Sequence, residues 1–431
     1  MWLFCIQNLV WMLVIVLQLD SKHMKKKIKV YKFGGTSVGS VEKIQAIADR
    51  LMAESNTTQH VVVVSAMGHT TDQLVTLCSQ ISTSPEPREY DALISTGENV
   101  SAALLSMSII EKGGQAISLS GAQAGIFTSN GHKRAKIVDV KPERIQSELD
   151  QGKVVVVTGF QGISEFNDIT TIGRGGSDTS AVVLAAALGV NECDIYTDVD
   201  GVYTTDPRIT NHASKLSAVS YDEMLELASM GAQVLHPRAV ECAKENDIIL
   251  HVRSSFLLDE GSCIKELKPM ELNRTVTGIA LKRDEAKLSV IGVPDQPGVA
   301  AKLFGTLSQH GINVDMIIQS NEETNQTNTI TFTVSEDEYQ DAERVAKEVA
   351  ETLGARQVVG DTNIAKISIV GVGMISKPGV AATMFRTLGE NKINIQLITT
   401  SEIKISCAIQ SDQADAAVSA LHNAFDLHIS E

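Results

Sequence analysis

The sequence predicts an α/β protein that ends in two copies of a smaller unit, and two observations carry this prediction. The first is a series of short apolar runs, residues 61–64, 154–157 and 194–196, separated by helical or glycine-rich segments. Strands that helices cover on both faces have this composition, so a mostly parallel sheet between two helical layers is expected. The second is an internal repeat in the last third of the chain.

Length, charge and cysteine content narrow the class of protein. The chain has 431 residues, 43% of them hydrophobic and 21% charged, which fits two or three soluble globular domains. A net charge of −15 argues against nucleic-acid binding and favours small polar substrates. The six cysteines contain no C-x-x-C pair, so neither disulfides nor a metal site are expected, and the reducing cytoplasm fits best.

The N-terminal segment differs in composition from the rest of the chain. Residues 2–19 are almost uniformly apolar, and three lysines follow at 25–27. The segment is long enough to span a membrane, and the lysines would then keep the remainder on the cytoplasmic side. It lacks the basic start and small-residue cleavage pattern of a signal peptide. We favour Met24 as the true start, with residues 1–23 outside the fold and no membrane association.

A glycine-rich bend, KFGGTSVGS at residues 32–40, lies between strand-like residues and apolar residues at helical spacing. The glycines are therefore expected at a strand-to-helix turn, where unpaired N–H groups attract anions. Gly34 and Gly35 lack the β-carbons that would hold an anion away, and Lys32 adds an ammonium group. The bend predicts a phosphate cradle, and an ordinary tight turn is the alternative. It matches neither a Walker loop nor G-x-G-x-x-G.

A second cluster, GRGGSDTS at residues 173–180, runs into an apolar helical stretch at 181–188. Its glycines and Ser177 can donate to a phosphate, while Arg174 can form two parallel hydrogen bonds with a carboxylate. Asp178 is either a helix cap or a charge-orienting residue in catalysis. Glu98, in Thr96-Gly97-Glu98, offers a carboxylate that could hold a substrate ammonium.

A third cluster follows the predicted strand at residues 194–196 and contains Asp-Gly and Asp-Pro turn signals. Within YTDVDGVYTTDPR, residues 196–208, an aromatic ring suits a base, carboxylates suit a ribose or magnesium, and Arg208 suits phosphates. The three clusters together predict a nucleotide-dependent phosphotransferase that acts on a small carboxylate.

At these clusters the sequence closely resembles the aspartate kinases, which belong to the amino acid kinase family. KFGGTS at 32–37, GRGGSD at 173–178 and YTTDPR at 203–208 match their signatures in order, and the similarity runs from about Lys27 to the C-terminus. The resemblance implies an amino-acid-kinase-like αβα sandwich that phosphorylates the β-carboxylate of L-aspartate with ATP and Mg²⁺. This reaction begins lysine, threonine and methionine biosynthesis. One departure is Gln233, where some relatives carry a lysine, which leaves a phosphate contact from its loop open.

The resemblance also implies roles for individual residues. The catalytic residues would be Lys32, Arg174 and Asp178. Contacts to ATP would come from Lys32, Phe33, Gly34, Gly35, Ser65, Thr197, Asp198, Tyr203, Asp206, Pro207 and Arg208, and contacts to aspartate from Thr71, Glu98, Arg174, Gly175, Gly176 and Ser177. The attacking carboxylate carries no proton at neutral pH, so no general base is needed. Alignment and charge neutralisation then supply the rate, and Asp178 orients groups.

The repeat in the last third comprises two matching units. Residues 288–293 match 367–372, and residues 297–301 match 378–382. Each copy predicts the order strand, Pro-Gly turn, helix, strand, strand, helix, and each is too small to bury much core alone, so pairing is expected. The copies resemble ACT domains, which are ferredoxin-like and bind amino acids at the first turn, commonly across an interface between copies.

The ACT resemblance implies inhibition by an end product, lysine and/or threonine. The implied effector residues are Asp295, Gln296, Pro297, Gly298, Val299, Ala300, Asn313, Val314, Asp315 and Gln319 in the first copy, and Val380, Ala381, Asn394, Ile395, Ser401 and Glu402 in the second. We expect a homo-oligomer through the ACT units. A shorter subunit could start internally, for example at Met270.

The expected organisation is a leader at 1–23, a catalytic domain at 24–265, a linker at 266–285 and ACT units at 286–360 and 361–431. Two other functions remain open. One is an amino-acid sensor whose kinase-like half is inactive, and the other is an amino acid kinase for glutamate, acetylglutamate or carbamate. Intact Lys32, Arg174, Asp178 and Arg208 favour an active kinase, and the paired ACT units favour aspartate.

Overall fold

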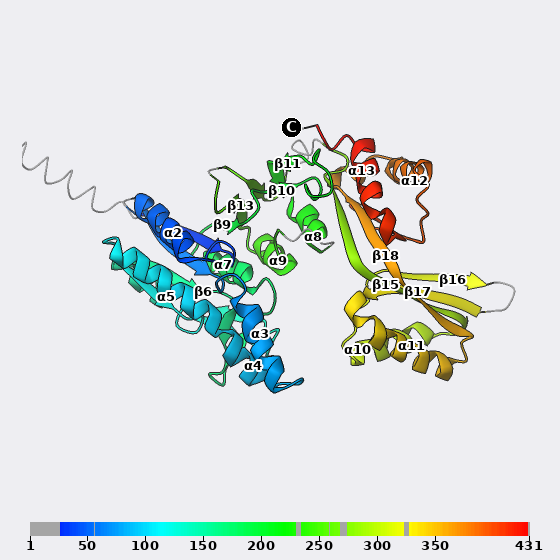
Figure 1. The fold of residues 1–431 in the computed structure, drawn as a ribbon, viewed down its shortest axis with the longest axis horizontal. Coiled ribbons are helices and arrows are strands. Elements are labelled where there is room, and N and C mark those ends of the chain that lie inside the picture. Colours follow the sequence, from blue (N-terminus) through cyan, green and yellow to red (C-terminus); the bar gives the residue numbers. More distant parts are fainter. Residues whose placement is uncertain are drawn as a thin grey trace, which may run out of the picture. The chain divides into compact units, whose positions relative to one another are not determined.

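The computed structural model describes residues 26–55, 57–229, 234–257, 259–267, 274–322 and 327–429. The leader at 1–23, Gln233 and Met270 lie outside the described residues. The chain divides into two compact units, one up to Asp198 and one from Val199 (Figure 1). This division falls inside residues 24–265, which the sequence assigns to one catalytic domain.

The first unit contains parallel strands in the order β9-β1-β2-β6-β3. The valine runs lie side by side in register, with Val61 next to Val155 and Val63 next to Val157, and all four are 0% exposed. The expected parallel sheet is therefore confirmed. The strands are β1 (Lys27–Phe33), β2 (Thr58–Val64), β3 (Ala116–Leu119), β6 (Val154–Thr158) and β9 (Glu192–Thr197).

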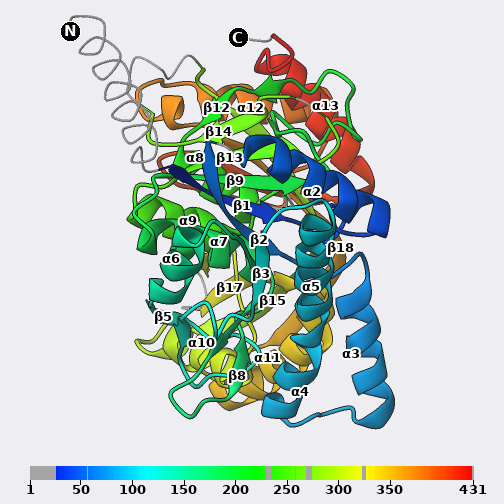
Figure 2. The same cartoon turned by 90° about the vertical axis from the view of Figure 1, so that its left-hand side faces the viewer.

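Helices cover both faces of this sheet. On one face α2 (Val41–Glu54) and α5 (Thr96–Glu111) lie side by side and form a core with β1, β2 and β6. On the other face lie α6 (Glu143–Asp150) and α7 (Gly176–Ala187) (Figures 1 and 2). Because α7 contacts β1, β2 and β9, it reaches the middle of the sheet. This is the αβα sandwich that the sequence predicts.

A small sheet and two more helices complete the first unit. The sheet has the order β5-β4-β7-β8, and the helices α3 (Thr70–Ile81) and α4 (Pro87–Ile94) pack against each other. Of the described residues, one helical stretch, residues 87–111, is long enough and apolar enough to cross a membrane, and half of its apolar 18-residue window is buried in the protein. The small strands are β4 (Ile126–Thr128), β5 (Ile137–Val140), β7 (Gln161–Ile163) and β8 (Ile169–Thr171).

The second unit begins with short strands and two packed helices. The pair β10 (Val202–Tyr203) and β11 (Lys215–Leu216) is antiparallel, and β14 (Ser262–Ile264) pairs with β12 (Ala218–Val219) and β13 (Ile249–Ser254). The helices are α8 (Tyr221–Ser229) and α9 (Pro237–Glu245).

Both repeats fold in the predicted order. The first has β15 (Gly278–Pro294), α10 (Val299–Gln309), β16 (Ile317–Glu322), β17 (Thr327–Ser335) and α11 (Tyr339–Leu353). The second has β18 (Gln357–Val370), α12 (Val380–Glu390), β19 (Leu397–Thr400), β20 (Lys404–Gln410) and α13 (Ala414–Ala424). Their strands form one sheet, in the order β16-β17-β15-β18-β20-β19.

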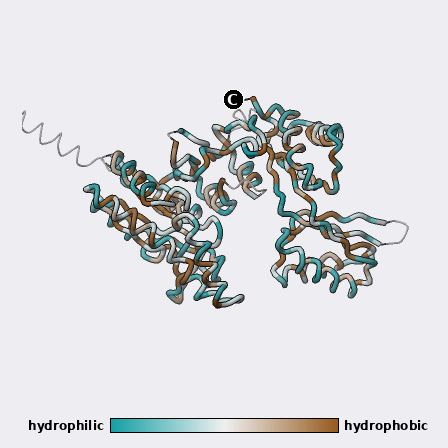
Figure 3. The backbone as a smooth tube through the Cα atoms, in the orientation of Figure 1, coloured by the Kyte–Doolittle hydropathy of each residue, from teal (hydrophilic) through white to brown (hydrophobic). Residues whose placement is uncertain are grey.

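The two long strands each serve both repeats. The second half of β15, residues 285–294, pairs with β17 of the first repeat, whereas its first half, residues 278–282, pairs with residues 366–370 beside β20. The segment 266–285, which the sequence predicts as a linker, therefore ends inside a strand. Figure 3 shows hydropathy along the backbone, and helices with one buried side, such as α2 and α11, alternate between brown and teal. Helix α7 differs, because none of its residues is exposed.

Candidate active site

The carboxyl ends of the parallel strands are tied together by main-chain hydrogen bonds. The Gly34 N–H donates to the Tyr196 carbonyl at 3.0 Å, and the Gly68 N–H donates to the Gly35 carbonyl at 3.0 Å. The Gly159 N–H donates to the Val64 carbonyl, also at 3.0 Å. We call this region, with the first turns of α5 and α7, the catalytic edge. Parallel α/β sheets bind ligands at this end of their strands.

The glycine-rich bend is needed for a close backbone approach. A β-carbon on Gly35 would lie 2.9 Å from the Ala66 carbonyl oxygen, so no side chain fits there. The glycines lie at a strand-to-helix turn, as expected, because β1 ends at Phe33 and α2 begins at Val41 with Ser40 as its N-cap. Turns closed on the Gly34 carbonyl separate the glycines from the helix itself.

Lys32 and Asp178 form a buried ion pair at the catalytic edge. Lys32 Nζ, at the end of β1, lies 2.6 Å from Asp178 Oδ1 in the first turn of α7, and both side chains are 11% exposed. The contact lies outside hydrogen-bonding geometry, so it is mainly a charge interaction. The helix-cap interpretation of Asp178 is wrong, because Gly175 is the N-cap. Asp178 thus holds the Lys32 ammonium group beside the N-terminus of α7.

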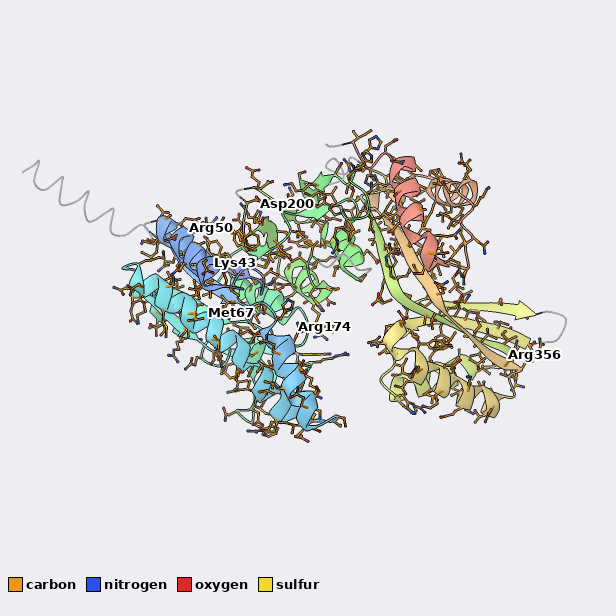
Figure 4. The ribbon with its side chains drawn as sticks, in the orientation of Figure 1. Lys43, Arg50, Met67, Arg174, Asp200 and Arg356 are labelled. Carbon is orange, nitrogen blue, oxygen red and sulfur yellow. The ribbon has the colours of Figure 1, made fainter. Side chains whose placement is uncertain are left out.

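Helix α7 begins five residues earlier than the apolar stretch in the sequence suggests. Gly175 has the left-handed φ of 70° that precedes the helix, and Gly176 and Ser177 open the first turn. A β-carbon on Gly159 would lie 2.6 Å from Ser177 Oγ, which brings the loop after β6 against this turn. The first N–H groups of a helix have no partner within it and favour anions. Arg174 is exposed on the preceding loop (Figure 4).

Glu98 supplies a second buried carboxylate, from the first turn of α5. Its side chain is 3% exposed, and Oε1 accepts a hydrogen bond from the Ala66 N–H at 3.1 Å. Oε2 is buried and has no hydrogen-bond partner among the described residues. Burial raises the pKa of Glu98 to about 7. An unpaired buried carboxylate oxygen suits a ligand with an ammonium group. Thr71 is half-buried in the first turn of α3, and Ser65 is half-buried after β2.

Asp91 organises the loops beside Arg174, and sequence reasoning missed it. It is 0% exposed and accepts hydrogen bonds from Thr171 Oγ1 at 2.6 Å, from the Lys133 N–H at 3.0 Å and from His132 Nδ1 at 2.9 Å. A β-carbon on Gly173 would lie 3.2 Å from the Lys133 carbonyl oxygen, so this loop packs against the one that carries Arg174. No signal in the sequence distinguishes this aspartate from those on exposed helix faces.

Several residues predicted to contact the nucleotide form side-chain hydrogen bonds with their neighbours in sequence. In the second unit, Tyr203 OH donates to Asp200 at 3.0 Å. The Arg208 Nη2 donates to Asp206 Oδ2 at 2.7 Å, and this bond lowers the pKa of Asp206. Arg208 is 87% exposed, and Pro207 beside it is also exposed. In the first unit, Thr197 Oγ1 donates to Asp198 Oδ1 at 3.0 Å.

The predicted effector residues of the first ACT unit lie at an open turn and strand edge. Asp295, Gln296, Pro297 and Gly298 are exposed, and Gly298 has a left-handed φ of 92° as the N-cap of α10. Asp295 Oδ1 accepts from Asn328 Nδ2 at 2.9 Å. Val299 and Val314 are half-buried, whereas Ala300, Asn313 and Gln319 are exposed. Asp315 forms an ion pair with Lys366 of the second ACT unit, so its carboxylate already has a cationic partner.

The second ACT unit repeats this turn in different surroundings. Gly379 has a φ of 99° and precedes α12, where Val380 is buried and Ala381 half-buried. A cavity of about 690 Å³ adjoins this turn and is lined by Arg274, Lys377 and Arg386 among others. The remaining predicted residues, Asn394, Ile395, Ser401 and Glu402, lie around β19, and all but Ile395 are exposed.

Comparison with known proteins divides the chain in the same way as the sequence analysis, into a kinase-like region and two ACT units. The model of the amino acid kinase family matches residues 27–254, and that of the ACT domain matches residues 288–349 and 367–425. An aspartokinase of Bacillus sp. strain MGA3 is 51% identical over 399 residues, which cover 92% of this chain and 97% of the relative.

Solved structures of aspartate kinases have the same architecture. The enzyme from Synechocystis is 46% identical, with a TM-score of 0.52, over 94% of this chain and 70% of that one. Aspartokinase III of E. coli has been solved with aspartate and ADP (24% identity, TM-score 0.77, 93% of this chain and 100% of that one) and with lysine and aspartate (25%, 0.72, 93% and 100%). The chain therefore belongs to the aspartate kinases of the amino acid kinase family and carries two ACT domains.

Proposed function

We propose that the catalytic edge binds aspartate and the phosphates of ATP while the β-carboxylate of aspartate is phosphorylated. The observation that carries the assignment is the pair of buried carboxylates with opposite environments. Asp178 lies against Lys32 at 2.6 Å, whereas Glu98 keeps one oxygen without a partner among the described residues. One carboxylate thus holds a protein cation in place, and the other is available for a cation of the substrate.

On the substrate side, Glu98 takes the ammonium group of aspartate and Arg174 takes a carboxylate. A guanidinium can form two parallel hydrogen bonds with a carboxylate, which fixes the substrate's orientation as well as its charge. Thr71, Gly175, Gly176 and Ser177 complete this side. The network around Asp91 keeps the Arg174 loop in place, since four donor groups converge on that one carboxylate.

On the phosphate side, Lys32 and the start of α7 neutralise negative charge. Gly35 lets the backbone pass close to the Ala66 carbonyl, so the bend can approach a ligand without a side chain in the way. Phosphoryl transfer spreads charge over the equatorial oxygens, and preorganised cations and N–H groups stabilise that charge. Ser65, Thr197, Asp198, Tyr203, Asp206 and Arg208 contact the nucleotide.

Magnesium enters with the nucleotide in this proposal. Mg²⁺ is usually held by substrate phosphates, waters and one or two carboxylates. Within the described ranges, no group of three or more His, Cys, Asp or Glu residues could hold a metal ion. No protein base is assigned, because the attacking β-carboxylate is already ionised at neutral pH.

We also propose cytoplasmic activity at the start of lysine, threonine and methionine synthesis, with inhibition by lysine, threonine or both at the ACT domains. Lysine is present with aspartate in the T-state structure of E. coli aspartokinase III, which supports this choice of effector. A homo-oligomer formed through ACT domains would supply the second side of the exposed turns.

The test is an ADP-release assay with purified protein and MgATP. Aspartate, glutamate and N-acetylglutamate are compared as acceptors, and Lys32→Met serves as the inactive control. We expect release with aspartate alone, and hydroxylamine trapping should identify the acyl phosphate. Equal release with glutamate would contradict the substrate assignment. No release with any acceptor would support the amino-acid sensor instead.

A further inference from the structure

The segment at residues 203–209, here called the nucleotide loop, is built into the packing of the second ACT unit. Thr204 is 0% exposed, and its carbonyl accepts a hydrogen bond from the Ile279 N–H of β15 at 2.7 Å. The fit is tight, because a β-carbon on Gly278 would lie 3.1 Å from the same carbonyl oxygen. The side chain of Ile209 packs against the hydrophobic core that α12, α13, β18 and β20 form. Backbone and side chain are therefore both anchored.

A buried polar contact joins the same loop to α13. Thr204 Oγ1 lies 2.9 Å from His422 Nε2, and the Ser214 N–H donates to the same hydroxyl at 3.0 Å. His422 is 0% exposed, and burial lowers its pKa to about 4, so the ring is neutral at pH 7. A neutral imidazole can accept or donate at Nε2, and the threonine hydroxyl can do either in return. Figure 1 shows α13 beside the β10–β11 region of the unit.

A second set of contacts ties α8 to the same ACT unit. Glu223 is 2% exposed, and its Oε1 accepts from Thr277 Oγ1 at 2.6 Å and from the Val372 N–H at 3.0 Å. At the edge of this contact, Lys404 Nζ lies 2.8 Å from Glu226 Oε2. These bonds attach α8 to the second ACT unit. Helix α8 follows directly after β11 and β12, and β11 pairs with β10 at the start of the nucleotide loop, so the segments around the loop are attached as well. By contrast, the first ACT unit forms its hydrophobic core from residues 286–358 alone.

We infer that the second ACT unit supports the nucleotide loop and that His422 is a positioning residue for ATP binding. This rests on the proposed nucleotide role of Tyr203, Asp206 and Arg208. Thr204, which contacts His422, directly follows Tyr203 in the sequence, and Ile209 directly follows Arg208. The loop is thus held at both ends by the same ACT core, which restricts the positions of the residues between them.

The test separates this bond from general packing of α13. We compare Thr204→Val and His422→Leu, which remove the polar contact, with Thr204→Ser and His422→Gln, which keep a group that can hydrogen-bond. Val418→Ala is the matched control, because Val418 is 0% exposed in the same core one turn earlier on α13. Steady-state kinetics give KM for MgATP, KM for aspartate and kcat, and calorimetry gives the Tm of each variant.

We expect Thr204→Val and His422→Leu each to raise KM for MgATP about 3- to 10-fold, the equivalent of one neutral hydrogen bond. KM for aspartate should stay within about twofold, because the substrate side is assigned elsewhere. Thr204→Ser and His422→Gln should recover most of the change. In the double variant the two effects should add only in part, since both substitutions remove the His422 contact and Thr204→Val alone also removes the hydrogen bond from the Ser214 N–H.

The inference is overturned if KM for MgATP in both variants matches that of Val418→Ala at a similar loss of Tm. Arg208→Ala distinguishes this failure from failure of the proposed function. A raised KM for MgATP in Arg208→Ala, with none in the His422 and Thr204 variants, overturns only the role of His422. An unchanged KM for MgATP in Arg208→Ala overturns the nucleotide assignment of the loop and the inference together.

Discussion

The catalytic edge and the effector turns of the ACT units use glycine for opposite reasons. Gly35 is required by crowding, because a carbonyl oxygen lies 2.9 Å from where its β-carbon would be. Gly298 and Gly379 have left-handed φ values, and nothing lies within 4 Å of the corresponding positions. The edge is closed and its side chains are held before any ligand arrives. The ACT turns are open, so a ligand or a partner unit must supply the other wall.

This contrast predicts the largest effect at Lys32. Lys32→Met should lower kcat by about three or more orders of magnitude, since it removes a preorganised charge from the transferring phosphate. It should also lower stability, because Asp178 is left buried without its cation. The double variant with Asp178→Asn should regain the Tm but not the activity. A single variant with most of its kcat would remove Lys32 from the phosphate site.

Glu98→Gln should have the next largest effect, on aspartate binding. Losing a charged hydrogen-bond partner of the ammonium should raise KM for aspartate about 10- to 100-fold at pH 8. In the wild type, KM for aspartate should rise as pH falls below about 7, because Glu98 becomes protonated. The variant should show no such rise between pH 6 and 8. A wild-type KM that is flat over this range would contradict the assignment.

The raised pKa of Glu98 also predicts how stability depends on pH. The native state keeps a proton on Glu98 up to about pH 7, whereas the unfolded chain releases it near pH 4. Stability therefore falls as pH rises through this window. Glu98→Gln should remove that part of the slope, so its Tm relative to wild type should be higher at pH 8 than at pH 5.

Arg174→Lys tests the exposed loop that precedes α7. The charge is kept, but an ammonium cannot reproduce two parallel hydrogen bonds, so KM for aspartate should rise about tenfold at saturating MgATP. Arg144→Lys, at an exposed position on α6, is the control and should be neutral. An unchanged KM in Arg174→Lys would place Arg174 outside the substrate site.

The ACT turns should have the smallest effect on catalysis itself. Asp295→Ala or Asn313→Ala should leave kcat within about twofold, yet weaken inhibition by lysine or threonine at least fivefold, within the usual range of allosteric coupling. Glu351→Ala, exposed on α11 of the same unit, controls for surface charge. Inhibition that is unchanged in both turn variants would place the effector elsewhere.

The elements that could be predicted from the sequence are those with a repeating pattern. The valine runs of β2 and β6, the order of elements in both repeats and the helix that follows the second glycine-rich cluster all follow from periodicity and composition. Lys32 and Glu98 were also predicted at the site, on chemical grounds. Composition also shows where a buried strand ends, because polar and glycine-rich residues follow each apolar run.

Contacts between distant residues could not be predicted in this way. Asp91 accepts hydrogen bonds from a loop residue, Lys133, and from Thr171 of β8, and His422 meets Thr204 across 218 positions of sequence. Nothing local marks either residue, because an aspartate or histidine in an amphipathic helix has the same pattern whether buried or exposed.

The shared strands β15 and β18 have a consequence for folding during synthesis. The second ACT unit needs residues 278–282 beside residues 366–370, so its first strand emerges before the whole first unit and its other strands emerge after it. Such pairing across a long intervening segment is slow to form, because the loop must close first. The first ACT unit can collapse around its own core earlier. A growing chain would therefore complete the first ACT unit before the second, and residues 203–209 would gain their anchoring contacts only when the second ACT unit closes.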